Sequence, residues 1–183
     1  ALCLGVKDYF NKTGHQKSVI GLSGGIDSSL TACIAVDAIG KENVWGISMP
    51  SSFSSDHSKV DAKKLAKNLG IPLHNLSINK IVQSIMQTLQ PLFNGLPPNV
   101  AEENIQARIR GTLLMAIANK FGWLVLSTGN KTELALGYCT LYGDMSGGLS
   151  IISDLSKKNV YALSQWVNES AGYKRIPGNC LSK

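Results

Sequence analysis

Residues 18–29 read SVIGLSGGIDSS, an apolar run followed by two adjacent glycines, several serines and one aspartate. The apolar run predicts a buried strand, and the residues from about Asp27 onward predict a helix. Gly24 and Gly25 carry no Cβ and tolerate positive φ, so the connection between the two elements can approach a ligand closely. The N-terminus of a helix offers unpaired N–H groups and a partial positive charge, which favour an anion. This stretch therefore predicts a loop that binds phosphate.

The rest of the chain alternates predicted strands and helices. Strands are expected at residues 18–22, 43–50, 72–78 and 123–129, and helices at 28–40, 60–70, 79–93, 100–121 and 154–172. Asp56 or Ser58 is the expected N-cap of the second helix. This order predicts an α/β fold, with a doubly wound, mainly parallel sheet and helices on both faces. In such sheets the ligand lies beyond the carboxyl ends of the strands, where SGGIDSS, SMPSSFSSDH and STGNKTE fall.

The composition argues against several classes of function. The 183 residues are 44% hydrophobic and 16% charged, which predicts a compact domain and argues against intrinsic disorder. The net charge of +6 favours an anionic partner, but the lysines are scattered, so no nucleic-acid partner is expected. With no apolar run long enough to span a membrane and no signal peptide, we expect a cytoplasmic protein without a membrane partner. The four cysteines and three histidines lack the spacing of metal ligands, which argues against a zinc site.

The glycine-rich segment differs from the common phosphate-binding motifs. It has no lysine where a Walker A loop requires one, and its glycines do not follow the G-x-G-x-x-G spacing. Asp27 would repel phosphate unless a cation lay between them, so we expect Mg²⁺ to bridge its carboxylate and the phosphate oxygens. The alternative from the residues alone is a tight turn in which Asp27 or Ser28 caps the helix.

SGGIDS resembles the pyrophosphate-binding loop of the N-type ATP pyrophosphatases, which split ATP into AMP and pyrophosphate. Three further segments, ENIQARIRG (103–111), STGNKTELALGYCTLYGD (127–144) and DLSK (154–157), resemble NAD synthetase. The similarity covers nearly the whole chain, and SMPSSFSSDHS and ALCLGVKDYF are most like the synthetase domain of the glutamine-dependent enzymes. The resemblance implies an adenine nucleotide alpha hydrolase-like fold.

The reaction implied by this resemblance is the ATP-dependent amidation of deamido-NAD (nicotinic acid adenine dinucleotide) to NAD. The nicotinate carboxylate attacks the α-phosphate of ATP, which releases pyrophosphate and leaves an acyl adenylate. Ammonia then attacks the carbonyl carbon, and AMP is released. The chain would thus be a ligase that forms a carbon–nitrogen bond, with ATP as co-substrate and Mg²⁺ as cofactor.

Matches to the family's motifs assign the ATP site. The resemblance implies catalytic roles for Asp27, Glu133 and Lys157, with Asp27 and Glu133 holding Mg²⁺ and Lys157 contacting phosphate. A pair of carboxylates that converges on phosphate oxygens suits Mg²⁺, which usually binds through one or two carboxylates. The residues expected to bind ATP are Gly21, Leu22, Ser23, Gly24, Gly25, Ile26, Asp27, Ser28, Met49, Thr128 and Lys157.

The site for the dinucleotide substrate is assigned in the same way. The resemblance implies that Asn104 and Arg108 bind deamido-NAD, and their spacing of four places them on one face of a helix. Arg110 lies off that face and is expected to be a structural partner instead. The residues expected to bind deamido-NAD are Asn104, Arg108, Glu133, Tyr138 and Asp144.

Residues 1–183 are expected to form a single NAD synthetase domain. Relative to the family, the chain is expected to be truncated at the C-terminus and to lack the N-terminal glutaminase domain. Ammonia would then arrive free, or from a separate glutaminase domain or subunit. The apolar residues of the helices at 79–93 and 100–121 exceed what one packed face needs, and the family builds a dimer from this region. We therefore expect a homodimer.

Two other functions remain open. Another N-type ATP pyrophosphatase, such as a tRNA-modifying enzyme or a GMP synthetase-like amidotransferase, would share the glycine-rich segment. The tRNA-modifying alternative requires RNA binding with a steep salt dependence. The other alternative is a non-catalytic nucleotide-binding module, although a mere binder has no need of the two carboxylates Asp27 and Glu133.

Overall fold

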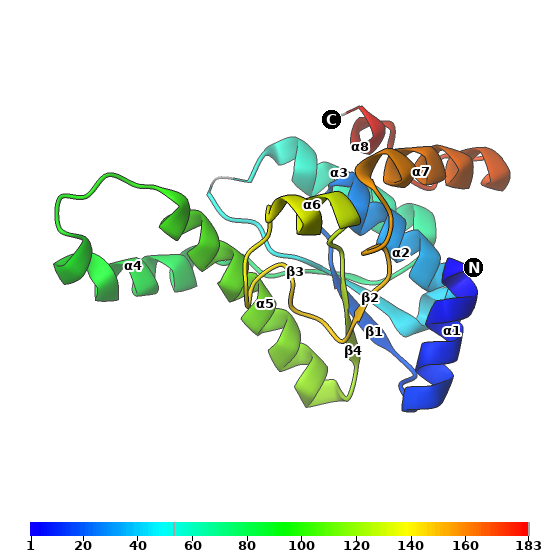
Figure 1. Cartoon of the computed structure of the whole chain (residues 1–183), viewed down its shortest axis with the longest axis horizontal. Coiled ribbons are helices and arrows are strands. Elements are labelled where there is room, and N and C mark those ends of the chain that lie inside the picture. Colours follow the sequence, from blue (N-terminus) through cyan, green and yellow to red (C-terminus); the bar gives the residue numbers. More distant parts are fainter. Residues whose placement is uncertain (53, 183) are drawn as a thin grey trace.

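The computed structural model describes residues 1–52 and 54–182. Within them the strands form one five-stranded sheet in the order β3-β2-β1-β4-β5, and every neighbouring pair is parallel. β1 lies at the centre, between β2 and β4, so the strand order reverses there (Figure 1). The expected parallel α/β sheet is confirmed. The bounds are β1 Ser18–Gly21, β2 Val44–Ser48, β3 Leu73–Asn75, β4 Leu124–Ser127 and β5 Leu149–Ser150.

Helices cover both faces of the sheet, as expected for a doubly wound fold. Helices α1, α2, α3, α7 and α8 pack on one face, and α4 and α5 pack on the other (Figure 1). Successive residues of a strand point to opposite faces, so Ile20 enters the first core and Val19 the second. The bounds are α1 Leu2–Thr13, α2 Ile26–Ile39, the 3₁₀ turn η1 Lys41–Asn43, α3 Asp56–Leu69, α4 Asn79–Phe93, α5 Val100–Phe121, α6 Lys131–Leu136, α7 Lys157–Ala171 and α8 Gly178–Leu181.

Helix α2 follows β1 directly and is buried on nearly all sides. Residues 28–35 are all buried, and α1, α3 and α7 surround the helix. This burial fits its sequence, IDSSLTACIAVDAI, in which Asp27 and Asp37 are the charged residues. The helix that begins at the glycine-rich segment is therefore held from several directions, which gives that segment a fixed base.

Several boundaries differ from the expectations. Helix α3 begins at Asp56 because Ser55, not Asp56 or Ser58, is its N-cap, and Ser55 Oγ accepts a hydrogen bond from the Ser58 N–H. Strand β3 is shorter than predicted, although the Leu76 N–H still donates to the Ser48 carbonyl beyond it. The elements α1, α6, α8 and β5 are not predicted by the sequence patterns above. By contrast, α4 and α5 have the predicted bounds.

The C-terminal residues 173–182 fold back over α2. The Arg175 guanidinium makes two hydrogen bonds with the Asp37 carboxylate, 2.7 and 3.0 Å long. Farther along, Cys180 Sγ donates to the Gly24 carbonyl at 3.4 Å. This segment therefore supports the glycine-rich turn from the side of the helical layer.

Helix α4 and the first turns of α5 extend from the sheet as an arm (Figure 1). A capping box fixes the start of α5: the Asn99 side chain accepts from the Ala101 N–H, and the Glu102 carboxylate accepts from the Asn99 N–H. None of the helices in the described ranges is both long and apolar enough to cross a membrane.

Candidate active site

The glycine loop, which joins β1 to α2, is held by its own hydroxyls and by close packing. Gly24 has φ 77°, and a Cβ added there would lie 2.2 Å from the Ser58 carbonyl oxygen of α3. The Gly25 N–H donates to Ser23 Oγ at 3.2 Å, and the Ser28 hydroxyl donates to the Gly25 carbonyl at 3.1 Å. Gly24 thus permits a close approach, as the sequence predicts, but the group that approaches is the backbone of α3.

Three charged side chains meet beside this loop. Lys157 Nζ, at the start of α7, lies 2.5 Å from Asp27 Oδ2 and 3.7 Å from Glu133 Oε1. Asp27 is in the first turn of α2 and Glu133 is in the first turn of α6. The three residues that the motifs assign to catalysis are therefore brought together in space; we call them the ion cluster.

The carboxylates set the protonation of Lys157. Partial burial by itself would lower the pKa of the Lys157 amine, but the hydrogen bond and charge of Asp27 and the charge of Glu133 outweigh burial and raise that pKa. The amine is therefore charged throughout the neutral range. The ion pair stabilises the fold at pH values below the ordinary pKa of lysine, and this contribution is lost as the pH rises through the raised value.

Asn130 positions both carboxylates of the ion cluster. Its side chain is fully buried: Nδ2 donates to Asp27 Oδ1 at 2.9 Å, and Oδ1 accepts from the Glu133 N–H at 3.0 Å. The Glu133 carboxylate accepts in return from the Asn130 N–H, which completes a capping box at the start of α6. The sequence analysis missed Asn130 as a site residue, although the N-x-x-E spacing in NKTE is the signal that could have found it.

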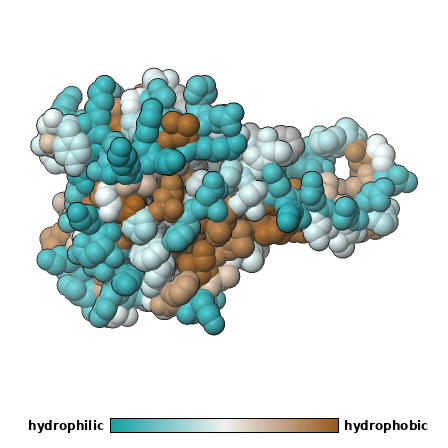
Figure 2. All heavy atoms as spheres, turned by 180° about the vertical axis from the view of Figure 1, so that it is seen from behind, coloured by the Kyte–Doolittle hydropathy of each residue, from teal (hydrophilic) through white to brown (hydrophobic). Residues whose placement is uncertain are grey.

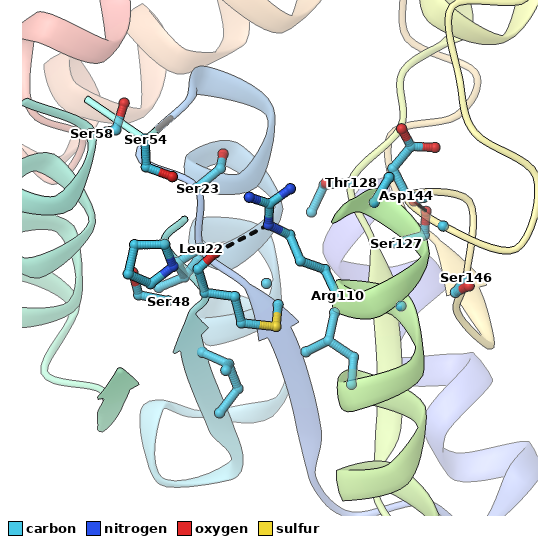
Figure 3. Close-up of a pocket in the computed structure, with 18 of the residues that line it drawn as sticks. Leu22, Ser23, Ser48, Ser54, Ser58, Arg110, Ser127, Thr128, Asp144 and Ser146 are labelled. Carbon is cyan, nitrogen blue, oxygen red and sulfur yellow. Dashed lines mark hydrogen bonds between the residues drawn. The ribbon is translucent and has the colours of Figure 1, made fainter. Parts of the chain in front are cut away.

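A cavity of about 360 Å³ opens at the carboxyl ends of β1, β2 and β4 (Figure 3). Its wall combines apolar side chains with hydroxyls and backbone groups at the strand ends, a composition typical of small-molecule sites. We call it the nucleoside cavity because of its size and lining. The predicted ATP-binding residues that line it are Gly21, Leu22, Ser23, Met49 and Thr128.

Six of the predicted ATP-binding residues lie outside this cavity, and two of them, Asp27 and Lys157, belong to the ion cluster. Gly24 and Gly25 form the loop beside it, and Ser28 is buried, with its hydroxyl used within the loop. Ile26 is 4% exposed and belongs to the hydrophobic core. Any contact between Ile26 and a ligand is therefore limited to the backbone.

Asn104 and Arg108, predicted to bind the dinucleotide, both contact the loop that follows α6. The Thr140 hydroxyl donates to Asn104 Oδ1 at 2.8 Å, and Arg108 Nε donates to the Leu141 carbonyl at 3.2 Å. Their predicted common face on α5 is thus the face that meets this loop. The other nitrogens of Arg108 extend from an exposed side chain.

Asp144 and Tyr138, in the same loop, differ in position. Asp144 lines the nucleoside cavity, and its Oδ1 accepts from the Thr140 N–H at 2.8 Å. Tyr138 is 81% exposed and does not line the cavity. Asp144 is therefore brought to the cavity, whereas the Tyr138 ring lies at the surface.

Arg110 occupies a place that the sequence does not predict. Its side chain points into the nucleoside cavity from α5, and its Nε donates to the Met49 carbonyl at 3.1 Å (Figure 3). Burial lowers the pKa of its guanidinium. The hydrogen bond to Met49 is the structural contact expected of Arg110, and the structure adds that the face of α5 that carries Arg110 meets the cavity.

A second cavity of about 450 Å³ adjoins the first, and Ser54 and Arg110 line both. Glu102 and Glu103, from the start of α5, give the second cavity an acidic wall. Arg110 therefore stands at the boundary between a largely apolar cavity and an acidic one.

This arrangement suits the chemistry of a nucleoside polyphosphate. Ser23 connects the two parts of the site, because it lines the nucleoside cavity and its Oγ lies 3.2 Å from Ser28 Oγ, next to Asp27 in the chain. Phosphates attached to a nucleoside in the cavity would extend toward the N-terminus of α2 and the ion cluster. Across residues 1–52 and 54–182, no group of three or more His, Cys, Asp or Glu side chains could hold a metal ion. A metal ion would therefore need oxygens of the ligand in addition to Asp27 and Glu133.

Comparison with known proteins gives consistent matches. A family model described as NAD synthase matches residues 1–183. The glutamine-dependent NAD(+) synthetases of Synechocystis sp. and Thermotoga maritima are 59% and 54% identical to the chain over 183 residues. Each match covers the whole of this chain but 32% of the relative, so the chain spans about a third of the length of these curated relatives.

Solved structures match over the whole chain as well. The glutamine-dependent NAD+ synthetase from Acinetobacter baumannii, in complex with ADP, has a TM-score of 0.98 and 47% identity, and 35% of it is covered. The NH3-dependent NAD synthetase from Campylobacter jejuni has a TM-score of 0.87 and 32% identity, and 74% of it is covered. An NMN synthetase from Francisella tularensis has a TM-score of 0.89 and 28% identity, and 71% of it is covered.

Replacing Gly24 with alanine tests the packing of the glycine loop. Gly24→Ala is expected to lower the free energy of unfolding by about 3 kcal/mol, from a left-handed backbone penalty of about 1 kcal/mol and an overpacking cost of about 2 kcal/mol. Gly14→Ala is the matched control, because Gly14 has φ 74° and no atom within 4 Å of an added Cβ. Gly14→Ala should lower the free energy of unfolding by only the backbone penalty of about 1 kcal/mol. Urea denaturation measures both, and equal losses would show that Ser58 imposes no steric constraint.

Proposed function

The chain belongs to the NAD synthase family, and we propose that it catalyses the ATP-dependent amidation of deamido-NAD to NAD, with AMP and pyrophosphate as products. The observation that carries the proposal is the convergence of Asp27, Glu133 and Lys157 beside the glycine loop and the nucleoside cavity. Relatives named as glutamine-dependent and NH3-dependent NAD synthetases support it, and one of them was solved with ADP.

In the first step, a carboxylate oxygen of the nicotinate attacks the α-phosphorus of ATP, and the bond to pyrophosphate breaks. The attack brings one anion toward another, so groups that neutralise charge lower its barrier. The N-terminus of α2 and Lys157 would hold the departing pyrophosphate, while the nucleoside cavity fixes the adenosine. Lys157 would exchange its contact with Asp27 for a phosphate oxygen.

In the second step, ammonia attacks the carbonyl carbon of the acyl adenylate, and AMP leaves as the amide forms. The nucleophile must be neutral, because ammonium has no lone pair, and it must be placed close to the carbonyl with water excluded. We assign the nicotinoyl end to the loop held by Asn104 and Arg108, next to Asp144. The exposed Tyr138 ring would cover the nicotinate after it binds.

Mg²⁺ is the proposed cofactor, and Asp27 and Glu133 fit it. Both carboxylates approach one cation, the Lys157 amine, and Mg²⁺ takes oxygen ligands from one or two carboxylates together with phosphates and water. When bound, it would supply charge neutralisation at the phosphate oxygens of ATP. Asn130 would keep the two carboxylates oriented for this purpose.

The nitrogen donor and the length of the second substrate are further parts of the proposal. Ammonia would come free or from glutamine through a glutaminase domain or subunit, since relatives of both kinds match. The match to an NMN synthetase makes nicotinate mononucleotide the second candidate substrate. We propose the cytoplasm as the location, because ATP is the co-substrate, and cell fractionation followed by the assay below checks it.

Pyrophosphate release by the full-length protein tests the function. With ATP, Mg²⁺ and either ammonium or glutamine, release is expected only when deamido-NAD is added, and NAD should form in equal amount. Nicotinate mononucleotide in place of deamido-NAD is the control for substrate length and should give slower release. ADP as the product, or release that ignores both nicotinate compounds, would refute the proposal.

Replacing Lys157 separates its two proposed contacts. Lys157→Met should slow pyrophosphate release about 100-fold, because one charge that stabilises the leaving group is lost. The same change should tighten Mg²⁺ binding in the absence of nucleotide, because the amine no longer occupies Asp27. Calorimetric titration with Mg²⁺ measures the second effect. Lys158→Met is the matched control, since Lys158 is an exposed neighbour in α7; if both variants lose the same activity, the assignment of Lys157 fails.

The homodimer is also a proposal, and the apolar surface of the helical arm supports it. Hydrophobic side chains gather on the rear face, where the arm joins the body (Figure 2). Helix α4 has no buried residue despite its apolar stripe. Exposed hydrophobic residues of α4 and α5 are Ile81, Leu92, Val100, Met115 and Phe121. A second copy covering this surface would remove it from water.

Sedimentation of the full-length protein checks the dimer. Met115→Glu places a charge within the apolar surface of α5 and is expected to shift the protein from dimer to monomer. Leu4→Glu is the control, because Leu4 is 64% exposed on α1, away from the arm. A wild-type protein that sediments as a monomer at micromolar concentration would exclude the proposed dimer.

A further inference from the structure

Arg110 is a half-buried cation that forms no ion pair with a carboxylate of the described residues. Among the described residues, the cations that line the nucleoside cavity are Lys59 and Arg110, and the carboxylate that lines it is Asp144. Lys59 Nζ lies 2.9 Å from Asp56 Oδ1 and is therefore paired. No carboxylate of the described residues lies within 4 Å of the Arg110 guanidinium. A guanidinium removed from water without a counter-charge is costly, so the cavity favours an anion that would supply one.

The donors of Arg110 are divided between the protein and the cavity. Its Nε donates to the Met49 carbonyl, which fixes the plane of the guanidinium. A guanidinium has five N–H donors, so the N–H groups of the two terminal nitrogens remain for a ligand. Figure 3 shows these nitrogens projecting into the cavity between Ser23 and Thr128. Paired donors in a fixed plane are suited to a phosphate group.

The position of Arg110 identifies which phosphate it can reach. The ion cluster and the N-terminus of α2, where the β- and γ-phosphates are assigned, lie outside the lining of the nucleoside cavity. The nucleoside is assigned to the cavity itself, at the ends of β1, β2 and β4. The α-phosphate connects the two and must pass Ser23, which the Arg110 guanidinium faces (Figure 3).

We propose that Arg110 binds the α-phosphate of the nucleotide, first in ATP, then in the acyl adenylate and finally in AMP. This assignment rests on the proposed function, because it takes the nucleotide to be cleaved between the α- and β-phosphates. Once pyrophosphate leaves, the charges assigned to it no longer hold the intermediate. Arg110 remains and retains the adenylate until ammonia attacks the carbonyl carbon. Its role is thus distinct from that of Lys157.

Titration calorimetry of the full-length protein with AMP and with adenosine tests this role. The variants are Arg110→Gln, which removes the charge, and Arg110→Lys, which keeps it without the planar fork. Lys120→Gln is the matched control, because it removes one positive charge from the same helix at an exposed site outside the cavity. Thermal unfolding of each variant confirms that it is folded.

Arg110→Gln is expected to weaken AMP binding about tenfold or more and to change adenosine binding less than twofold. Arg110→Lys should bind AMP with intermediate affinity, and Lys120→Gln should match the wild type. Equal losses for AMP and adenosine would overturn the proposal, since Arg110 would then shape the base or ribose site. If Arg110→Gln binds AMP as tightly as the wild type does, and the wild type forms NAD, the role of Arg110 is overturned while the proposed function stands. A wild-type protein that forms no NAD instead refutes the function itself.

Discussion

The hydrogen bond between Asn130 and Asp27 joins the two halves of the site, together with the contacts of Lys157 with Asp27 and Glu133. The buried Asn130 amide donates to Asp27, and Asn130 follows β4 whereas Asp27 follows β1. These two strands are neighbours at the centre of the sheet, where the strand order reverses. A buried amide left without its partner is costly, so this bond holds the strand ends at one separation. The capping box of α6 also fixes the position of Glu133 relative to Asn130.

The charged side chains of the site form two groups: the ion cluster, which would bind an added cation, and Arg110, which would bind an anion. In the ion cluster, the Lys157 amine is shared by two carboxylates and has no excess positive charge to offer. A polyphosphate therefore requires an added cation or a rearrangement of Lys157. In the nucleoside cavity, the Arg110 guanidinium forms no ion pair with a carboxylate of the described residues. At the ion cluster, an added cation or a moved Lys157 would offset the repulsion between the carboxylates and a polyphosphate. At the nucleoside cavity, the Arg110 guanidinium can attract a phosphate directly.

The sequence predicts those parts of the fold that depend on long, regular patterns. The bounds of α4 follow from the helical spacing of its apolar residues, and those of α5 follow from the break at residues 95–99 and the long helical run after it. The glycine loop follows from its adjacent glycines, serines and single aspartate. Strand β5 has two residues and α6 has six, so neither is long enough to show the hydrophobic periodicity that predicts a strand or a helix. Such elements form because neighbouring strands and helices supply their partners.

The sequence also predicts only part of where the side chains of the site lie. Helical spacing correctly separates Arg110 from Arg108, since residues two apart point about 200° from each other. Spacing alone does not say which of the two faces meets the cavity; the packing of α5 against β1 and β4 decides that. The same holds for Asn130. Its capping role can be predicted from the local N-x-x-E spacing, but its hydrogen bond to Asp27 depends on the pairing of β1 with β4.

The wide separation of the site residues along the chain has a consequence for biosynthesis. Asp27 precedes Asn130 by 103 residues and Lys157 by 130 residues. At roughly 5–20 residues per second, the ribosome adds the missing partners on the order of ten seconds after the glycine loop. During that interval the nascent chain has the glycine loop but no complete ion cluster. The ion cluster can therefore form only after β4 and α7 have docked.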